Sequence, residues 1–530
     1  MPAQKHLSPI LQVDHLTFQF DNGETLFKDI ALSLTARLTG LVGRNGAGKS
    51  VLASVLAGTR KATRGGVRLN GQCEFLSQLP SELTQSRQSI ARFLEIEEQL
   101  LALKKVEQGS SDPQWFEVIG DQWQLEQEVS HLLTDLGLPV NTSLPCHTLS
   151  GGQLSRLRLW KLFHSRADLL ILDEPSNHLD QEGRQWLLEQ MLKFKGFILL
   201  ISHDRMLLRN MEQILELNSK GLTVFGGHYD FYEEQKALKV AAFERQLENA
   251  QKERKQLKRR AQSNQEKADQ RAAIGKRLRK SGGLPKIVLD GMKGSAEKSA
   301  SKRLNAERTR EEQSRKKLEN LKQQQEQLKI QKLSLKSSDS RSERKVFIQD
   351  LVLPYGSDKP LNLVLDKRSR LHLSGANGCG KSTLMKVLLG DVQPFSGELS
   401  IHSEFFYLDQ HFHLLKPELN LLENMAVFCS SIRELEVRQL LAGIGFRGEA
   451  VYRKVENLSG GEKMKLAMLI VSHQPEEPML LLDEPDNHLD IDSRKMLAEA
   501  LTVFQGAFIL ISHDDDFICE AGVNECLTLS

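Results

Sequence analysis

The stretch Gly43-Arg-Asn-Gly-Ala-Gly-Lys49-Ser50 fits the phosphate-binding loop pattern GxxxxGK[ST]. It follows a short apolar run, residues 38–42, and precedes a helical pattern at 51–57. Glycines let the backbone curl so that successive N–H groups point at phosphate oxygens, and the following helix N-terminus adds positive potential. The lysine can then reach the β- and γ-phosphates, while the serine hydroxyl binds Mg²⁺. The order of strand, loop and helix predicts an α/β nucleotide-binding domain.

A second stretch, Gly375-Ala-Asn-Gly-Cys-Gly-Lys381-Ser382, fits the same pattern, and further signals follow both loops at matching offsets. Leu149-Ser-Gly-Gly-Gln153 corresponds to Leu458-Ser-Gly-Gly-Glu462. Apolar runs that end in two acids, 169–174 and 480–484, place the second acid 24 and 25 residues after those serines. A histidine stands 29 residues beyond the second acid in both halves. Because the whole series occurs twice, we predict two copies of one α/β domain.

The paired acids and the histidine have roles that follow from their positions. They are Asp173, Glu174 and His203 in the first copy and Asp483, Glu484 and His513 in the second. The aspartate, at the end of a buried strand, can orient the water shell of Mg²⁺. The adjacent glutamate can take a proton from an attacking water, and the histidine can contact the γ-phosphate and hold that water in line. This set predicts an active site in each copy where water attacks a γ-phosphate.

In these motifs and their order the chain resembles a protein with two ATP-binding cassettes in tandem. The resemblance implies that ATP and Mg²⁺ bind at both phosphate loops and that ATP is hydrolysed. It implies that Phe20 and Tyr355 stack on adenine. It also implies that Gln78 and Gln410, which follow short apolar runs, approach the metal and the attacking water.

The two Leu-Ser-Gly-Gly motifs each begin a helical pattern, at 153–163 and 462–471. A helix N-terminus with glycines that permit close approach is an anion site. In cassette ATPases this site acts on the nucleotide of the opposite cassette. The resemblance therefore implies two composite sites, which combine Lys49, Glu174 and His203 with Ser459, and Lys381, Glu484 and His513 with Ser150.

The expected site residues fall into three groups. Nucleotide contacts are expected from Phe20, Gly43, Arg44, Asn45, Gly46, Ala47, Gly48, Lys49, Ser50, Val51, Ser150, Gly151, Gly152, Tyr355, Gly375, Ala376, Asn377, Gly378, Cys379, Gly380, Lys381, Ser382, Thr383, Ser459, Gly460 and Gly461. Metal contacts are expected from Ser50, Gln78, Asp173, Ser382, Gln410 and Asp483. Catalysis is expected from Glu174, His203, Glu484 and His513.

Two positions depart from the usual cassette pattern. Val51 stands where a second hydroxyl is usual after the loop, and Asp486 replaces the usual threonine near Glu484. These changes are either neutral or give the two sites different turnover rates.

Length and composition set the remaining bounds. The 530 residues, 40% hydrophobic and 26% charged, suit three or four globular units and exclude a disordered chain. The longest apolar runs, such as 196–201, are far shorter than the ~20 residues needed to cross a bilayer. Residues 1–11 show no secretory signal, and the six cysteines form no CxxC pair. We therefore expect a reduced, cytoplasmic protein with no membrane segment and no zinc site.

Charge is concentrated in the segment between the two copies. Residues 236–340 carry 29 Lys and Arg against 13 Asp and Glu, a net charge of +16 in a chain whose total is +2. Residues 236–274 and 296–335 are polar, free of proline and read as two long helices, and Gly282-Gly-Leu-Pro285 must interrupt them. The segment predicts an antiparallel helical hairpin with a basic tip, Lys276-Arg-Leu-Arg-Lys280, that suits a polyanionic partner.

Two cassettes, a basic helical linker and the motif Phe225-Gly-Gly-His-Tyr-Asp-Phe-Tyr232 together resemble the ABC-F family of ribosome-associated ATPases. The resemblance implies that the linker enters the exit-tRNA site and contacts rRNA and tRNA, in translation or in ribosome protection or rescue. It also implies a monomer whose cassettes pair within the chain. The interval from the loop lysine to the Leu-Ser-Gly-Gly serine is 101 residues in the first half and 78 in the second. The extra residues predict an arm-like insertion at about 82–129.

We therefore predict a first cassette at 1–235, a hairpin linker at 236–340 and a second cassette at 341–530. Two other functions fit parts of the sequence. A DNA-associated ABC ATPase would also use a basic linker, and the ATPase subunit of a transporter would use the cassettes but would need a separate membrane partner.

Overall fold

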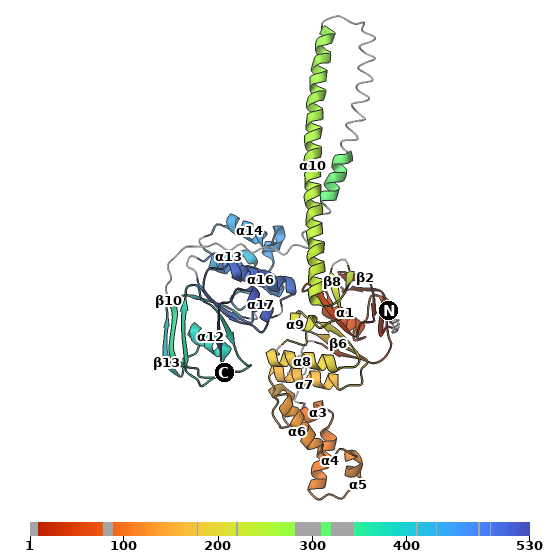
Figure 1. The fold of residues 1–530 in the computed structure, drawn as a ribbon, viewed down its shortest axis with the longest axis vertical. Coiled ribbons are helices and arrows are strands. Elements are labelled where there is room, and N and C mark those ends of the chain that lie inside the picture. The colour runs from red at the N-terminus through yellow and green to blue at the C-terminus, as the bar shows by residue number, and fades with distance from the viewer. Residues whose placement is uncertain are drawn as a thin grey trace, which may run out of the picture. The chain divides into compact units, whose positions relative to one another are not determined.

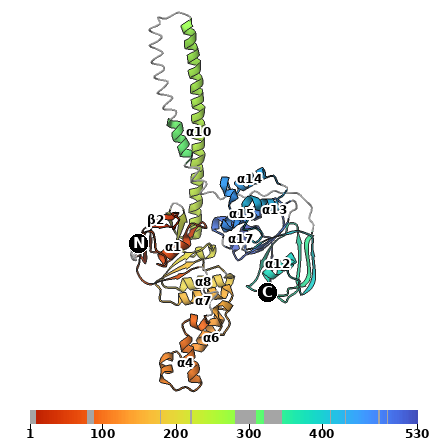
Figure 2. The ribbon, with the colours of Figure 1, turned by 180° about the vertical axis from the view of Figure 1, so that it is seen from behind.

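The computed structural model describes residues 9–77, 88–177, 179–218, 221–280, 309–319, 344–409, 412–430, 432–474, 478–487 and 489–529. The chain divides into two compact units. One unit comprises Met1–Asp230 together with Gln331–Ser530 and contains both cassettes. The other comprises Phe231–Ile330, the linker. Figures 1 and 2 show the chain from opposite sides.

The first cassette is built on two sheets. Its main sheet has the order β5-β6-β7-β3-β8-β9, parallel except for the β8–β9 pair. The strands are β3 Leu38–Gly43, β5 Cys73–Leu76, β6 Leu169–Asp173, β7 Phe197–Ile201, β8 Gln213–Asn218 and β9 Gly221–Gly226. A second, antiparallel sheet contains β1 Leu11–Gln19, β2 Thr25–Leu34 and β4 Arg64–Leu69. All five residues of β6 are buried, as expected for a parallel strand covered on both faces.

The second cassette repeats this arrangement. Its parallel sheet has the order β14-β15-β16-β12-β17. The strands are β12 Arg370–Ser374, β14 Phe405–Leu408, β15 Met479–Asp483, β16 Phe508–Ile511 and β17 Glu525–Thr528. Its antiparallel sheet contains β10 Arg344–Val352, β11 Leu361–Asp366 and β13 Ser396–Ile401. The predicted α/β fold with two cassettes is thus confirmed.

Matching helices pack on the sheets. In the first cassette they are α1 Lys49–Leu56, α7 Gly151–Phe163, α8 Gln181–Lys193 and α9 Arg205–Leu208, with a 3₁₀ turn at Cys146–Thr148. In the second they are α12 Lys381–Leu389, α15 Gly460–Val471, α16 Ile491–Val503 and α17 Asp515–Glu520, with 3₁₀ turns at Gly448–Tyr452 and Val455–Asn457. Ser150 and Ser459 cap α7 and α15 through complete capping boxes, so both motif helices begin directly after the serine.

A helical subdomain distinguishes the first cassette from the second. It contains α3 Ile90–Phe93, α4 Glu97–Glu107, α5 Pro113–Ile119 and α6 Leu125–Asp135, whereas the second cassette has α13 Leu421–Phe428 and α14 Glu434–Gly443. The β-bridges of Ser89 and Asn420 mark equivalent points. From there 61 residues lead to Ser150 but 39 lead to Ser459, so 22 of the extra residues lie in this interval. They form α4 and α5, which are separated from α7 and α8 by α6 (Figure 1).

The linker unit is dominated by α10, Tyr229–Lys280, a helix of 52 residues. It begins seven residues before the predicted helix start at 236. Residues 309–319 form a second helix, whose Lys317 Nζ lies 3.5 Å from Glu253 Oε2 on α10. Leu247 and Ala250 of α10 and Leu318 of the second helix are buried. The predicted turn at 282–285 and most of the predicted helix at 296–335 lie outside the described residues.

Candidate nucleotide-hydrolysis sites

The phosphate loop of the first cassette joins β3 to α1 with the lysine as the first helical residue. Gly48 has a φ of 94°, and a Cβ there would lie 2.7 Å from Leu26 Cδ2, so the loop requires glycine at this position. Lys49 Nζ donates to the carbonyl oxygens of Gly43 at 2.8 Å and Arg44 at 3.2 Å. Burial lowers the pKa of Lys49, and the negative charge of Glu174 opposes that shift. The ammonium is therefore held over its own loop, where phosphates would bind.

The second loop repeats this geometry between β12 and α12. Lys381 Nζ donates to the carbonyl oxygens of Gly375 at 2.7 Å and Ala376 at 3.0 Å. Gly380, with a φ of 104°, stands where a Cβ would lie 2.9 Å from Leu353 Cδ1. Both halves therefore build the same phosphate-binding loop.

The acidic pair of the first cassette lies at the carboxyl end of β6. Asp173 is 3% exposed, and burial raises its pKa while a hydrogen bond from Ser50 opposes the shift. Glu174 has a φ of 49°, a left-handed conformation that is strained for a residue other than glycine. Burial raises the pKa of Glu174 to about 7, with Lys49 and Arg494 acting in the opposite direction. A carboxyl group with this pKa can accept and release a proton near neutral pH.

The second acidic pair adopts the same backbone geometry with different neighbours. Glu484 has a φ of 50°, and burial raises its pKa. Asp483 Oδ2 accepts a hydrogen bond from Tyr407 Oη at 3.0 Å. The residue at the same register position of the first cassette is Phe75, which has no hydroxyl. The two metal-side aspartates therefore differ in hydrogen bonding.

The histidines lie beside the glutamates in both sites. His203 Nε2 is 3.6 Å from Glu174 Oε1, and His513 Nε2 is 3.6 Å from Glu484 Oε1. Burial lowers the pKa of His203 well below its ordinary value and lowers that of His513 to about 4. Both rings are therefore neutral at pH 7, so each can donate one hydrogen bond and accept another.

A cavity of about 450 Å³ brings most of the predicted first site together. The predicted site residues that line this cavity are Phe20, Asn45, Gly46, Gly48, Lys49, Ser50, Val51, Asp173, Glu174 and His203. Its other lining residues are Leu26, Asn177, Leu489 and Arg494. The last two belong to the second cassette, so the cavity is formed by both cassettes.

Other predicted residues lie outside this cavity or cannot be placed. Ser459, Gly460 and Gly461 are not among the described residues that line it. Tyr355 is 74% exposed. Gln78 and Gln410 lie outside the described residues.

Residues at the start of α16 in the second cassette contact the phosphate loop of the first cassette. Asp490, the N-cap of α16, accepts a hydrogen bond from the backbone N–H of Asn45 at 2.9 Å. Asp492 Oδ2 lies 3.7 Å from Arg44 Nε. The residues after Glu484 thus contact the first phosphate loop, as expected for cassettes that meet head to tail.

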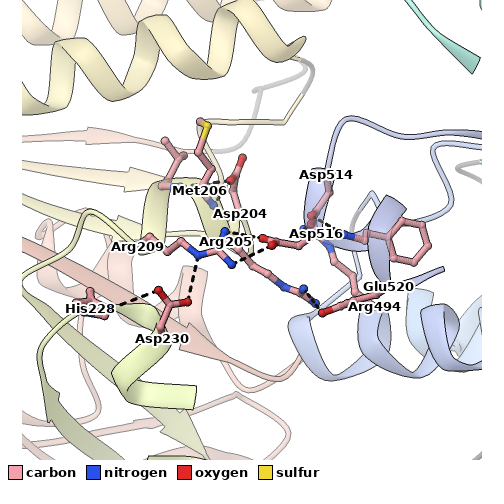
Figure 3. A network of polar contacts seen from close by, with 12 residues as sticks. Asp204, Arg205, Met206, Arg209, His228, Asp230, Arg494, Asp514, Asp516 and Glu520 are labelled. Carbon is pink, nitrogen blue, oxygen red and sulfur yellow. Dashed lines mark hydrogen bonds and ion pairs between the residues drawn. The ribbon is translucent and has the colours of Figure 1, made fainter. Parts of the chain in front are cut away.

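An ionic network borders the same interface (Figure 3). Arg205 Nη1 lies 2.6 Å from Glu520 Oε1, and Arg209 donates to both carboxylate oxygens of Asp516. Arg209 Nε also donates to Asp230 at 3.1 Å. Residues that follow His203 in the first cassette therefore form ion pairs with residues that follow His513 in the second.

Sequence reasoning missed Arg494, which lines the first site, and its counterpart Arg184, whose Nη1 donates to the carbonyl oxygen of His513 at 3.1 Å. A signal was available, because each arginine stands four residues after the aspartate of an Asn-His-Leu-Asp motif. Tyr407 carried no motif signal, since its partner Asp483 is 76 residues away.

The oxygen donors of the first site suit Mg²⁺. Asp173 Oδ1 is buried and has no hydrogen-bond partner among the described residues, and Ser50 lies beside it. The described residues contain no group of three or more His, Cys, Asp or Glu that could hold a metal alone. Mg²⁺ commonly takes one or two protein ligands and completes its shell with phosphate oxygens and water. Ser50 and Asp173 therefore fit a metal that arrives with a nucleotide.

Comparison with known proteins agrees with this geometry. A family model described as ABC transporter matches residues 27–177 and 359–487, and a second model with the same description matches 215–287. The ATP-binding protein Uup of Escherichia coli (strain K12) is 31% identical over 517 residues, which cover 92% of this chain and 75% of that protein. ABC transporter F family member 5 of Arabidopsis thaliana is 30% identical over 534 residues, 94% of this chain and 72% of that protein.

A further relative and one solved structure are also similar to this chain. The probable ATP-binding protein YheS of Escherichia coli (strain K12) is 31% identical over 491 residues, 90% of this chain and 72% of that protein. The archaeal ribosome recycling factor aABCE1, solved in complex with the ribosomal stalk protein aP1, has a TM-score of 0.51 at 17% identity. The match covers 97% of this chain and 87% of that one, and at this identity it concerns the fold alone. No helix in the part of the chain that the structure describes has the length and apolar character needed to cross a membrane.

Proposed function

The chain belongs to the ABC-F family of proteins with two ATP-binding cassettes, and on that premise we propose that it hydrolyses ATP at two composite sites. We further propose that this cycle controls its binding to the ribosome through the basic linker. The general reaction of ABC ATPase domains is ATP hydrolysis. We propose in particular which residues carry out the hydrolysis and which partner the linker binds.

At the first site each side chain has one task. Lys49 and the loop N–H groups bind the phosphates, and Ser50 and Asp173 would hold Mg²⁺, which neutralises phosphate charge when bound. Glu174 accepts the proton of the attacking water, for which its pKa of about 7 is suited. Neutral His203 holds that water or the γ-phosphate in place. At the second site the same tasks fall to the matching residues Lys381, Ser382, Asp483, Glu484 and His513.

The contacts between cassettes support the composite arrangement. Asp490 and Arg494 of the second cassette already contact the first site, through Asn45 N and the His203 carbonyl. We propose that ATP adds Ser459 to the first site, and Ser150 to the second, when the cassettes close. Bound ATP then holds the cassettes together, and hydrolysis lets them separate.

The observation that carries the ribosomal proposal is the charge of α10. From 252 to 280 this helix carries 12 Lys and Arg against three Asp and Glu. Lys255, Lys258, Arg259, Arg260, Lys267, Arg271 and Arg277 are exposed. Mutual repulsion of these charges is relieved by a polyanion, and rRNA and tRNA supply phosphates at high density. By analogy with the ABC-F family, we propose that the linker contacts the exit-tRNA site of the ribosome and that the protein acts in the cytoplasm.

Branched or single-stranded DNA is the second candidate partner. The same exposed cations would bind its backbone, because phosphate contacts carry no sequence information. The two proposals differ in what the closed protein should inhibit, which is translation in one case and DNA processing in the other.

The proposal is tested with the double variant Glu174→Gln, Glu484→Gln. Glutamine is nearly isosteric and still permits ATP binding, but it cannot accept a proton, a contribution typically worth ~100 to 10,000-fold in rate. The variant should stay closed with ATP, comigrate with ribosomes in a sucrose gradient without crosslinker, and inhibit cell-free protein synthesis. Wild type should do so only with a non-hydrolysable analogue.

The matched control is Glu189→Gln with Glu499→Gln, two exposed glutamates on α8 and α16. It should behave as wild type. A double variant that binds ATP and closes yet leaves translation untouched would refute the ribosomal proposal and favour DNA.

A further inference from the structure

Arg184 and Arg494 occupy the same place in the two cassettes. Each lies in the first turns of the helix after the Asn-His-Leu-Asp motif, α8 or α16. The side chains are 12% and 9% exposed. A guanidinium so deeply buried needs hydrogen-bond acceptors, and the identity of those acceptors indicates its purpose.

Arg494 reaches across to the first cassette. Its Nη1 donates to the carbonyl oxygen of His203 at 2.9 Å and lies 2.9 Å from Asp514 Oδ2 of its own cassette. Figure 3 shows Arg494 and Asp514 at the cassette interface. Arg494 therefore contacts the backbone of His203 in the opposite cassette. It also contacts Asp514, the residue after His513 in its own cassette.

Arg184 makes the reciprocal contacts. Its Nη1 donates to the carbonyl oxygen of His513 at 3.1 Å and lies 3.4 Å from Asp204 Oδ2. The two arginines thus connect both histidine loops in a closed cycle that crosses the interface twice.

The contacts within one cassette and those between cassettes are not equivalent. Asp514 is also fixed within its own loop, because its Oδ1 accepts from Phe517 N at 3.0 Å and its N–H donates to Ser512 Oγ at 3.1 Å. Asp204 is fixed in the same way by Met206 N and Ser202 Oγ. The histidine carbonyls, in contrast, receive their arginine from the opposite cassette. Loss of an arginine should therefore disturb the opposite histidine more than its own.

We propose that Arg184 and Arg494 are positioning residues that place the catalytic histidine of the opposite cassette. The inference rests on the proposed hydrolysis at two sites and adds a requirement to it. A histidine takes its catalytic position when the partner cassette is docked, so separated cassettes hydrolyse ATP poorly even where nucleotide is bound.

The test measures steady-state hydrolysis by the full chain with one site silenced. In the Glu484→Gln background turnover comes from the first site, and in the Glu174→Gln background from the second. Arg494→Gln should lower kcat about 10- to 100-fold in the first background, since misplacement of a catalytic group costs on that order. KM for ATP should change far less, because the hydrogen bonds of Arg494 among the described residues go to Asp486, His203 and Asp514, none of which lies in a phosphate loop. In the second background Arg184→Gln should cause the larger loss.

Two further variants separate positioning from general damage. Arg494→Lys keeps the buried charge but replaces a planar fork with a single ammonium, so it should recover part of the missing kcat. Arg438→Gln removes a partly exposed arginine that pairs with Glu434 on α14, and it should leave turnover unchanged in both backgrounds. Binding of a fluorescent ATP analogue to each variant shows that the phosphate loops remain folded.

The outcomes are distinct. Equal losses from each arginine in both backgrounds, or losses confined to KM, would overturn the positioning role while leaving two-site hydrolysis intact. If the silenced backgrounds with both arginines present hydrolyse no more ATP than the doubly silenced chain, two-site hydrolysis itself fails, and the positioning role fails with it.

Discussion

Arg209 and Asp516 form a two-point ion pair between the cassettes, with Nη1 to Oδ2 at 2.8 Å and Nη2 to Oδ1 at 2.9 Å (Figure 3). The two residues follow the equivalent histidines, Arg209 as the C-cap of α9 and Asp516 within α17. The first cassette has Arg205 and Arg209 in this region, whereas the second has Asp516 and Glu520. Counted from the equivalent histidines, Asp516 and Glu520 stand at the positions of Met206 and Asn210, so two identical first cassettes would lack both carboxylates. The divergence of the repeats therefore favours pairing of a first cassette with a second one.

Arg209→Glu should weaken this association, because it sets a carboxylate opposite Asp516. Arg209 is partly exposed, so the effect is modest, about 1 kcal/mol or less for the pair. The nucleotide-free variant should show a larger radius of gyration in small-angle X-ray scattering. Adding Asp516→Arg should restore part of the compaction, and Asp230, which also pairs with Arg209, keeps the recovery incomplete. A double variant no more compact than the single one would mean that the ion pair does not hold the cassettes.

The composite arrangement gives a prediction about the two motif serines. Ser459→Arg should abolish nucleotide trapping at the loop containing Lys49 and spare the loop containing Lys381, because the proposed closure brings the N-terminus of α15 to the first site. Ser150→Arg should do the reverse and is the matched control. Photocrosslinking of an azido-ATP analogue followed by peptide mapping distinguishes the loops. Loss at the Lys381 loop alone in the Ser459 variant would contradict the head-to-tail arrangement.

The sequence predicted the parts of the fold that local chemistry determines. Both phosphate loops, the strands ending in Asp173 and Asp483, and the helices after Ser150 and Ser459 appear where their motifs indicate. A phosphate loop needs its strand, its glycines and its helix in fixed order, so the motif carries the local structure with it.

Contacts between the repeats could not be predicted in the same way. The bond from Arg494 to the His203 carbonyl joins residues 291 positions apart, and neither residue's local pattern encodes the other. The start of α10 was also placed too late. The polar helical pattern predicts a helix from 236, yet the helix already begins at Tyr229, two residues after Gly227, whose φ of 100° lies in the left-handed region.

Glu174 should give the nucleotide-free, metal-free protein a distinctive pH dependence. Its folded pKa of about 7 lies above the ordinary value of 4.5, so the folded state binds more protons between these values. By linkage the Glu174 carboxyl alone adds up to about 3 kcal/mol of stability as pH falls from 8 to 5. The melting temperature of Glu174→Gln should exceed that of wild type at pH 8, and the gap should close by pH 5. The exposed control Glu189→Gln should show no such trend, and a constant gap for Glu174→Gln would place the pKa of Glu174 near its ordinary value.

The last prediction concerns the end of α10. Replacing Arg277, Arg279 and Lys280 with glutamate should weaken ribosome binding and flatten its dependence on salt. Each bound phosphate releases condensed counterions, so the slope of log K against log salt falls by roughly 0.7 to 0.9 for each phosphate that the variant no longer neutralises. ATP hydrolysis by the free protein should barely change, because these residues belong to the linker unit and the nucleotide sites lie in the other. Charge reversal at Arg245, Lys252 and Lys255, nearer the start of the helix, measures whether position matters beyond total charge. Equal weakening by both triple variants would mean that α10 acts as a diffuse cation. Weakening confined to 277–280 would identify the tip as the binding region, and unchanged binding in both at moderate salt would leave the linker without a polyanionic partner.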